Sequence, residues 1–167
     1  MSLRFLADRM LGKLAKKLRL LGFDTLYFPE EKEEKLLSIA MEQDRILLTK
    51  DTDFYKKAMK TGVKIFLLKS DRWRSQLKAV FDKFKIESSD LAPFSRCMEC
   101  NEPLETVDKE EIRDRIPEYI YLTHDEFKIC KKCGRVYWKG THVDHMVAEL
   151  SRILNGEVLF KYEDRDG

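Results

Sequence analysis

The sequence lacks a long apolar run, a marked excess of one charge and the loops of common nucleotide-binding enzymes. No segment approaches the roughly 20 apolar residues of a membrane-spanning helix, so we expect no membrane insertion. Lysine and arginine number 32 against 30 aspartates and glutamates, which gives no overall charge signature of nucleic-acid binding. The sequence has neither a Gly-Lys-Ser/Thr phosphate loop nor a Gly-x-Ser-x-Gly elbow, which argues against P-loop and serine-hydrolase chemistry.

Amide side chains are also rare, with two asparagines and two glutamines, while 37% of the residues are charged. This bias resembles that of proteins from thermophiles, which favour ion pairs over thermolabile amides. It indicates habitat and carries no information about activity.

Cysteine occurs only four times, in two Cys-x-x-Cys pairs formed by Cys97 with Cys100 and Cys130 with Cys133. Two intervening residues let both sulfurs of a pair reach one tetrahedral Zn²⁺, and the four cysteines then complete a Cys₄ site. The alternative is two disulfides, which need an oxidising compartment. The sequence opens without a signal-peptide pattern, so we expect a cytoplasmic location and favour zinc. A closed Cys₄ site predicts a structural zinc ribbon rather than a catalytic metal.

Strand-like and helix-like segments alternate over the first ninety residues. We expect strands at 3–7, 25–28, 46–49 and 63–68, and helices at 9–21, 33–43, 53–61 and 73–84. Strands that are apolar throughout and separated by helices indicate a parallel sheet covered on both faces. The sequence therefore predicts an α/β domain at 1–90, a zinc ribbon with a C-terminal helix at 94–156 and a tail at 157–167.

Acidic residues follow two of the predicted strands. Asp8 comes directly after the first strand, Asp51 and Asp53 follow the third, and Glu33 opens the second helix. Ligands of open parallel sheets bind beyond the carboxyl ends of the strands, so we expect these carboxylates to converge. Converging carboxylates favour a hard cation such as Mg²⁺ or Mn²⁺, which can activate water against a phosphodiester.

Each of these acidic residues also has a structural interpretation. An aspartate at these positions can cap the following helix or close a turn, and Glu33 complements a helix dipole. An aspartyl-nucleophile phosphatase is excluded, because Met10 stands where its second aspartate would follow Asp8. Metal-assisted phosphoryl chemistry and the absence of catalysis remain as the two interpretations.

Both halves of the chain resemble a known family, the PIN-like ribonucleases of the Mut-seven C-terminal type. The resemblance rests on residues 5–15, 18–25 and 45–51 of the sheet half and on residues 96–101, 107–117 and 137–142 of the ribbon half. It covers most of the chain, from about residue 3 to 150, with both halves in the expected order. It implies a PIN-like three-layer sandwich with a central parallel sheet, then a zinc ribbon, and metal-dependent cleavage of RNA.

PIN-type sites gather three or four carboxylates around Mg²⁺ or Mn²⁺, and the resemblance carries these roles to Asp8, Glu33, Asp51 and Asp53. The family usually has aspartate at the second position, so Glu33 departs from its pattern and the adjacent Glu34 is an alternative. Asp71, after the last strand, is an alternative to Asp53.

The resemblance also gives roles to basic and aromatic residues. It implies that Arg9, Lys13 and Lys50 hold phosphates near the catalytic ions. Trp138 has two interpretations, since it can stack on an unpaired base or belong to the ribbon core. After the last cysteine, substrate contacts are expected from Lys139, His142 and His145. The two histidines are spaced as metal ligands, but the Cys₄ set is already complete.

The sequence thus predicts a cytoplasmic endoribonuclease that leaves a 3′-hydroxyl and a 5′-phosphate, as the family resemblance implies. RNA is the expected partner, no membrane partner is expected, and association with ribosomes, tRNA or a protein inhibitor stays open, as does the oligomeric state. The alternative is a non-catalytic RNA-binding module, which would tolerate the substitution Asp51→Asn.

Overall fold

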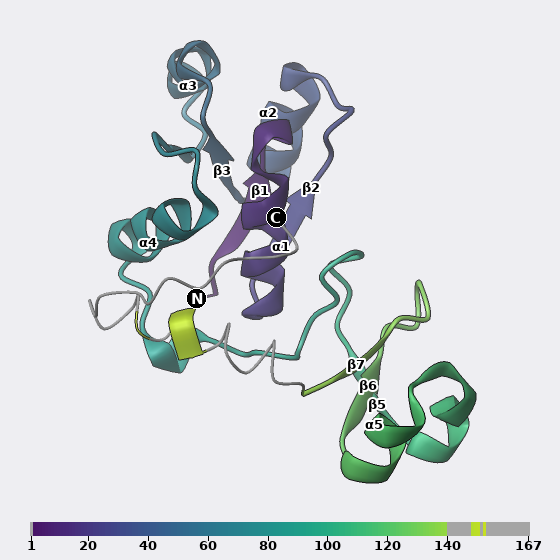
Figure 1. Cartoon of the computed structure of the whole chain (residues 1–167). Coiled ribbons are helices and arrows are strands. Elements are labelled where there is room, and N and C mark those ends of the chain that lie inside the picture. Colours follow the sequence, from purple (N-terminus) through teal and green to yellow (C-terminus); the bar gives the residue numbers. More distant parts are fainter. Residues whose placement is uncertain (1, 140–147, 151, 153–167) are drawn as a thin grey trace.

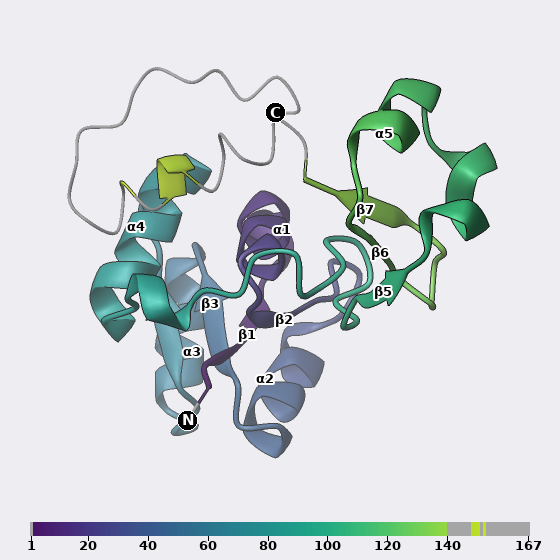
Figure 2. The same ribbon diagram turned by 90° about the horizontal axis from the view of Figure 1, so that it is seen from below.

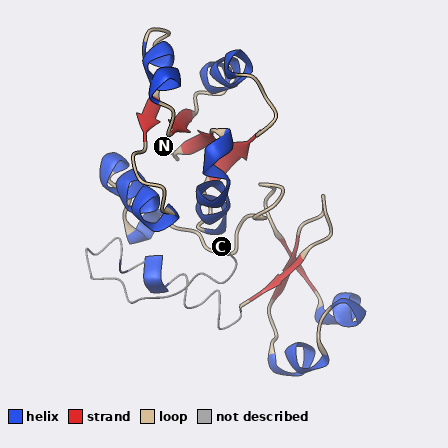
Figure 3. Ribbon diagram, turned by 45° about the horizontal axis from the view of Figure 1, so that its top comes forward, coloured by secondary structure: helices blue, strands red, loops and turns tan. Residues whose placement is uncertain are grey.

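The computed structural model describes residues 2–139, 148–150 and 152. These residues form a four-stranded parallel sheet with helices, followed by a three-stranded antiparallel sheet in the half that contains the four cysteines, which we call the ribbon half (Figures 1 and 3). The order of strands and helices in the first half agrees with the sequence prediction, with a shorter last strand. Its elements are β1 (Arg4–Ala7), η1 (Arg9–Leu11), α1 (Gly12–Leu20), β2 (Asp24–Tyr27), α2 (Glu33–Glu42), β3 (Ile46–Thr49), α3 (Thr52–Met59), β4 (Ile65–Leu67), α4 (Trp73–Phe84) and η2 (Ser88–Asp90).

The parallel sheet has the strand order β2-β1-β3-β4 and lies between two helical layers (Figure 2). Side chains of a strand alternate between its faces. Phe5 and Ala7 of β1 accordingly pack into one core with residues of α1 and α4, while Leu6 packs into a second core with residues of α2 and α3. Both faces of the sheet are therefore buried, as the apolar strands predicted.

Helix α1 ends at a turn where only glycine fits. Gly22 has a φ of +99°, in the left-handed region that favours glycine. A Cβ atom added there would lie 2.6 Å from the carbonyl oxygen of Ala92. The backbone N–H of Ala92 in turn donates to the carbonyl of Leu21 at 2.8 Å. At this turn, the linker around Ala92, which joins the two halves, packs directly against the end of α1.

The ribbon half contains β5 (Glu105–Val107), η3 (Lys109–Arg115), α5 (Glu118–Thr123), β6 (Phe127–Ile129) and β7 (Val136–Trp138). Its strands are antiparallel in the order β5-β6-β7. A small separate core forms around the fully buried Phe127, against which η3 and α5 pack Ile112, Ile116 and Ile120. The ribbon thus has its own core, although a small one, in addition to its cysteines.

Only part of the predicted C-terminal helix lies among the described residues. Residues 148–150 and 152 are helical, and Leu150 is buried in the core shared by α1 and α4. Glu149 forms an ion pair with Arg74 of α4. This helix therefore contacts the sheet half, although the predicted boundary groups it with the ribbon. The predicted tail at 157–167 lies outside the described residues. No helix in the described part of the chain is long and apolar enough to cross a membrane.

Candidate active site and metal centre

The strand order places two acidic residues at the switch point of the parallel sheet. From β1 the chain moves to β2 on one side, and β3 then pairs with β1 on the other side. The carboxyl ends of β1 and β3 therefore border a crevice, which is where open α/β sheets bind ligands. Asp8 directly follows β1, and Asp51 follows β3 after one residue.

The hydroxyl of Thr49 connects these two aspartates. It donates to Asp8 Oδ2 at 2.8 Å and accepts the backbone N–H of Asp51 at 3.0 Å. Thr49 is completely buried, and Asp8 is 7% exposed. The other oxygen of Asp8 accepts the N–H of Arg9 at 2.8 Å, and Asp51 Oδ1 caps α3 by accepting the N–H groups of Asp53 and Phe54. The capping roles expected of Asp8 and Asp51 are thus confirmed, and the same bonds fix both carboxylates in place.

A pocket of about 340 Å³ opens over this end of the sheet. Three of the predicted catalytic carboxylates, those of Asp8, Glu33 and Asp51, line it together. Two further glutamates, Glu30 and Glu31, come from the loop before α2. Five carboxylates thus face two basic side chains, those of Arg9 and Lys32, so the lining attracts cations.

The remaining acidic candidates lie apart from this lining. Asp53 is exposed in the first turn of α3 and does not line the pocket. Glu34 points to Lys57, with its carboxylate 3.1 Å from the ammonium, whereas Glu33 lies 3.9 Å from the same group. Asp71 forms an ion pair with Lys50. Of the alternatives raised by the sequence, the pocket contains Glu33 and lacks Glu34, Asp53 and Asp71.

Within the residues that the structure describes, the carboxylates of the pocket do not form a closed cage for a metal ion. In the described part of the chain, only the four cysteines bring three or more metal-ligand atoms within 4.8 Å of one another. Mg²⁺ retains several waters and is usually bound by one or two carboxylates together with substrate phosphates. Asp8, Asp51 and Glu33, which line the pocket together, are the carboxylates that could hold such an ion.

Of the predicted phosphate-binding residues, only Arg9 lines the pocket. Lys13 is exposed in the first turn of α1, on the element that follows Arg9. Lys50 precedes Asp51, and its ammonium is already paired with Asp71. Arg9 is therefore the residue of this predicted set that can contact a phosphate in the pocket, whereas Lys50 is engaged by Asp71.

The four cysteines form the second candidate site, in the ribbon. Tetrahedral zinc–sulfur bonds of about 2.3 Å imply sulfur–sulfur distances of about 3.8 Å. The Sγ atoms of Cys97 and Cys133 lie 3.9 Å apart, and all four sulfurs are within 4.8 Å of one another. The backbone N–H groups of Cys100 and Arg135 point to sulfurs at 3.4 and 3.5 Å, as in zinc knuckles. The donor set and its spacing therefore fit one zinc ion.

The thiols differ in acidity because their surroundings differ. Burial, together with hydrogen bonds with Cys133 and Cys130, raises the pKa of Cys100 to about 12. The backbone N–H of Arg135 lowers the pKa of Cys133 to about 7. Four sulfurs packed this closely ionise together only when a cation compensates their charge, so metal binding would be coupled to proton release.

The aromatic and basic residues near the ribbon cysteines serve largely structural contacts. Trp138 is half-buried and packs against Phe127 with ring centroids 6.4 Å apart, which favours the core interpretation of this tryptophan. The ammonium of Lys139 lies 5.9 Å from the ring centroid of Phe94. Tyr137 donates or accepts a 3.0 Å hydrogen bond at Cys97 Sγ. His142 and His145 lie outside the described residues.

Residues 97–101, which we call the cysteine loop, also hold the ribbon against the edge of the parallel sheet. Asn101, directly after Cys100, accepts the backbone N–H of Thr25 at 2.9 Å and donates to Asp24 at 2.7 Å. Arg19 donates to the carbonyl of Thr25 at 2.8 Å and to the carbonyl of Met98 at 2.9 Å. The N–H and the C=O of Thr25, which face outward from edge strand β2, are thus both bonded by side chains.

Sequence reasoning missed Thr49 and the two loop glutamates of the pocket. A hydroxyl at the end of an otherwise apolar strand, directly before Lys50 and Asp51, is a usable signal for Thr49. Glu30 and Glu31 lie in an acidic loop, and no local pattern tells which of its side chains enter a pocket.

Comparison with known proteins agrees with the resemblance read from the sequence. The family described as the Mut7-C RNAse domain matches residues 3–150. A human protein named exonuclease mut-7 homolog is 33% identical over 101 residues, which make up 59% of this chain and 12% of that protein. The chain therefore spans only about an eighth of that relative's length. No solved structure matches the chain.

Proposed function

Because the chain belongs to the Mut7-C RNase domain family, we propose that it is a metal-dependent endoribonuclease with a PIN-like fold. The observation that carries this proposal is the shared pocket of Asp8, Glu33 and Asp51 at the switch point of the sheet. The family match supports a nuclease role, and the pocket supports the location of its chemistry.

Asp8 and Asp51 would hold Mg²⁺ or Mn²⁺ at the ends of β1 and β3, with Glu33 opposite them. Such an ion supplies Lewis-acid stabilisation of the developing phosphate charge and makes water a better nucleophile at neutral pH. Thr49 keeps the Asp8 carboxylate oriented, and the capping bonds of α3 keep Asp51 in place. Arg9 would bind a non-bridging phosphate oxygen and so orient the scissile phosphodiester. Cleavage is expected to leave a 3′-hydroxyl and a 5′-phosphate.

The ribbon would bind the RNA outside this pocket, with zinc as a structural ion on Cys97, Cys100, Cys130 and Cys133. Lys131 and Lys132 are exposed between the last two cysteines. Each already has an acidic neighbour on the ribbon, Glu105 at 3.0 Å and Glu102 at 4.0 Å. These surface pairs are weak and give way to phosphates at little cost. We place the protein in the cytoplasm, where cysteines stay reduced for zinc.

The test is cleavage of two RNA substrates, one linear with a 5′ label and one covalently closed circle. Zinc-loaded protein is assayed with Mg²⁺, with Mn²⁺ and without added divalent metal. Asp8→Asn and Asp51→Asn should each lower the rate by two to three decades, since a metal ligand contributes several kcal/mol to the transition state. Asp82→Asn on the exposed face of α4 is the matched control and should cleave like wild type.

The circle separates modes of cleavage, because an exonuclease finds no end on it. Cleavage of the circle that needs metal and is lost in both variants supports an endoribonuclease. Digestion of the linear RNA without cleavage of the circle would indicate an exonuclease instead. RNA binding without any cleavage by wild type, unchanged in Asp51→Asn, would favour the non-catalytic binding module instead.

A further inference from the structure

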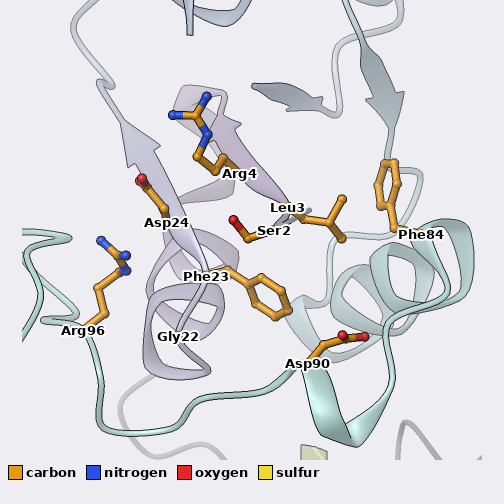
Figure 4. A pocket seen from close by; sticks show the side chains of 9 residues that line it. All are labelled: Ser2, Leu3, Arg4, Gly22, Phe23, Asp24, Phe84, Asp90 and Arg96. Atoms are coloured by element: carbon orange, nitrogen blue, oxygen red, sulfur yellow. The ribbon is translucent and has the colours of Figure 1, made fainter. Parts of the chain in front are cut away.

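A second pocket, of about 400 Å³, lies at the opposite, amino-terminal edge of the parallel sheet, next to the linker that leads to the ribbon. It is larger than the carboxylate pocket and shares no residue with it. Figure 4 shows Asp24 and Arg96 on one side of this pocket and Phe84 and Asp90 on the other. The proposed cleavage reaction gives this pocket no role.

Two guanidinium groups at this pocket lack a carboxylate partner. Neither Arg4 nor Arg96 forms an ion pair within the described part of the chain. Asp24, which also lines the pocket, is bound in a bidentate pair by Arg45 at 2.9 and 3.2 Å and also accepts from Asn101. Asp24 is therefore shared among several donors, and Arg96 interacts with its charge at longer range without forming an ion pair. Both guanidinium groups are thus open to an anion in the pocket.

Arg96 gives a second, independent indication of a missing partner. Its Nη1 donates to the carbonyl of Asn101 at 2.6 Å, but its buried Nε has no hydrogen-bond partner among the described residues. A buried donor without a partner costs stability, and in native proteins such a group usually bonds an ion, a water or a ligand. An anion that approached Arg96 could engage this side chain, with a small rotation of its guanidinium.

The rest of the lining suits a flat, partly polar ring. Phe23 and Phe84 supply aromatic surface, and Asp90 supplies a carboxylate that can accept from an amino or hydroxyl group. Pockets of roughly 300–1,000 Å³ with an apolar floor and a few polar groups are typical of small-molecule sites. In one ligand, a phosphate could bind the two arginines while a base packs against the two phenylalanines.

We propose that this pocket binds a nucleoside 5′-monophosphate, either free or as the 5′-terminal residue of an RNA. The choice of a nucleotide among phosphate esters rests on the proposed function, whose cleavage would generate such 5′-phosphate ends. The pocket would then recognise the product end of an earlier cut, on a surface separate from the carboxylates.

The test is calorimetric titration of zinc-loaded Asp51→Asn protein with UMP, AMP, uridine and inorganic phosphate, without added divalent metal. A nucleotide should bind saturably, and uridine and phosphate should each bind at least tenfold more weakly. Arg96→Gln and Arg4→Gln should each raise the Kd by roughly tenfold or more, since each removes a charge-assisted bond. Arg72→Gln, an exposed arginine at the start of α4, is the matched control and should leave the Kd unchanged.

Arg4→Gln leaves the bond from Arg96 to the cysteine loop intact, so weaker binding in that variant at unchanged zinc content cannot come from loss of the ribbon. Two short RNAs that differ only in a 5′-phosphate or 5′-hydroxyl then separate the sources of the nucleotide. Preference for the phosphorylated RNA assigns an RNA end, and binding of UMP alone assigns the free nucleotide.

Unchanged nucleotide affinity in both arginine variants, or phosphate binding as tight as UMP, would overturn the assignment. Failure of the proposed function is scored separately, in the cleavage of circular RNA by wild-type protein. A protein that binds UMP through Arg4 and Arg96 but cleaves no RNA would keep this pocket and lose the nuclease mechanism.

Discussion

Substitution of Asn101 tests how much its two side-chain hydrogen bonds to the parallel sheet contribute to stability. Its side chain is 8% exposed and makes two hydrogen bonds, one from the backbone N–H of Thr25 and one to the carboxylate of Asp24. Its backbone has a φ of +64°, in the left-handed region that asparagine tolerates better than most residues. Asn101→Gly removes the two hydrogen bonds and tolerates the left-handed backbone, whereas Asn101→Ala removes the bonds and also strains the backbone. The two substitutions therefore separate the contribution of the hydrogen bonds from that of the backbone conformation.

The magnitude follows from the two bonds. A neutral hydrogen bond contributes about 1 kcal/mol and one to a charged group about 1.5–3 kcal/mol. Asp24 is partly exposed and keeps its pair with Arg45, so the lower end of that range applies. We expect Asn101→Gly to lower the free energy of unfolding by about 2–3 kcal/mol. Asn101→Ala should lose about 1 kcal/mol more, since alanine is strained in the left-handed region.

The assay is urea unfolding of zinc-loaded protein together with hydrogen exchange at the amide of Thr25. Zinc content must equal that of wild type, so that loss of the metal is not measured instead. The Thr25 amide should exchange faster in both variants, while amides of β3 in the centre of the sheet should change only with global stability. A free energy within about 0.5 kcal/mol of wild type in Asn101→Gly, with unchanged Thr25 exchange, would refute this account of the fastening.

Four further outcomes are expected. Burial opposes ionisation of Asp24, but hydrogen bonds from Arg45 and Asn101 outweigh it and hold its pKa below the usual value. The contribution of ionised Asp24 to the free energy of unfolding is therefore complete above about pH 4 and is lost as the pH falls below about 4. Urea unfolding of Asp24→Asn at a series of pH values should show less of this acid dependence. Thr49→Val should lower stability by about 1–3 kcal/mol in urea unfolding and also reduce RNA cleavage, with Thr49→Ser restoring most of both. Trp138→Ala should destabilise the ribbon by about 2–3 kcal/mol in thermal unfolding, less than for a fully buried tryptophan because Trp138 is half-buried, whereas Trp138→Phe should keep RNA affinity in a gel shift if the residue belongs to the core. Removal of zinc by a strong chelator should speed hydrogen exchange in β5, β6 and β7 far more than in β1 and β3.

The sequence predicted those parts of the two sites that depend on local spacing. The short turn within each Cys-x-x-Cys pair brings its two sulfurs together locally, and the number and spacing of the cysteines predicted that the two pairs share one site. Asp8 and Asp51 were predictable because each follows an apolar strand, and the carboxyl ends of parallel strands share one edge of the sheet. The catalytic roles of these residues stay predictions, since nothing yet tests them directly.

The remaining contacts depend on which segments meet in space. The bond from Asn101 to Thr25 joins residues 76 positions apart, and the bond from Thr49 to Asp8 joins residues 41 positions apart. Neither pair has a local pattern that marks it. The second pocket is likewise built from segments far apart in the sequence, which are the first strand, the turn after α1, the end of α4 and the linker, so no local pattern marks its lining.

The hydrogen bonds from the cysteine loop to β2 also bear on whether the edge of the parallel sheet can pair with another chain. An edge strand with open N–H and C=O groups is a template for pairing with another chain. In the finished protein, Asn101 and Arg19 occupy both groups of Thr25, so this edge offers no ladder at its centre. Arg19 belongs to the sheet half, whereas Asn101 belongs to the cysteine loop, so a chain that completes its sheet before it acquires zinc would leave the N–H of Thr25 open. We therefore expect the supply of zinc during synthesis to affect how much of the chain aggregates.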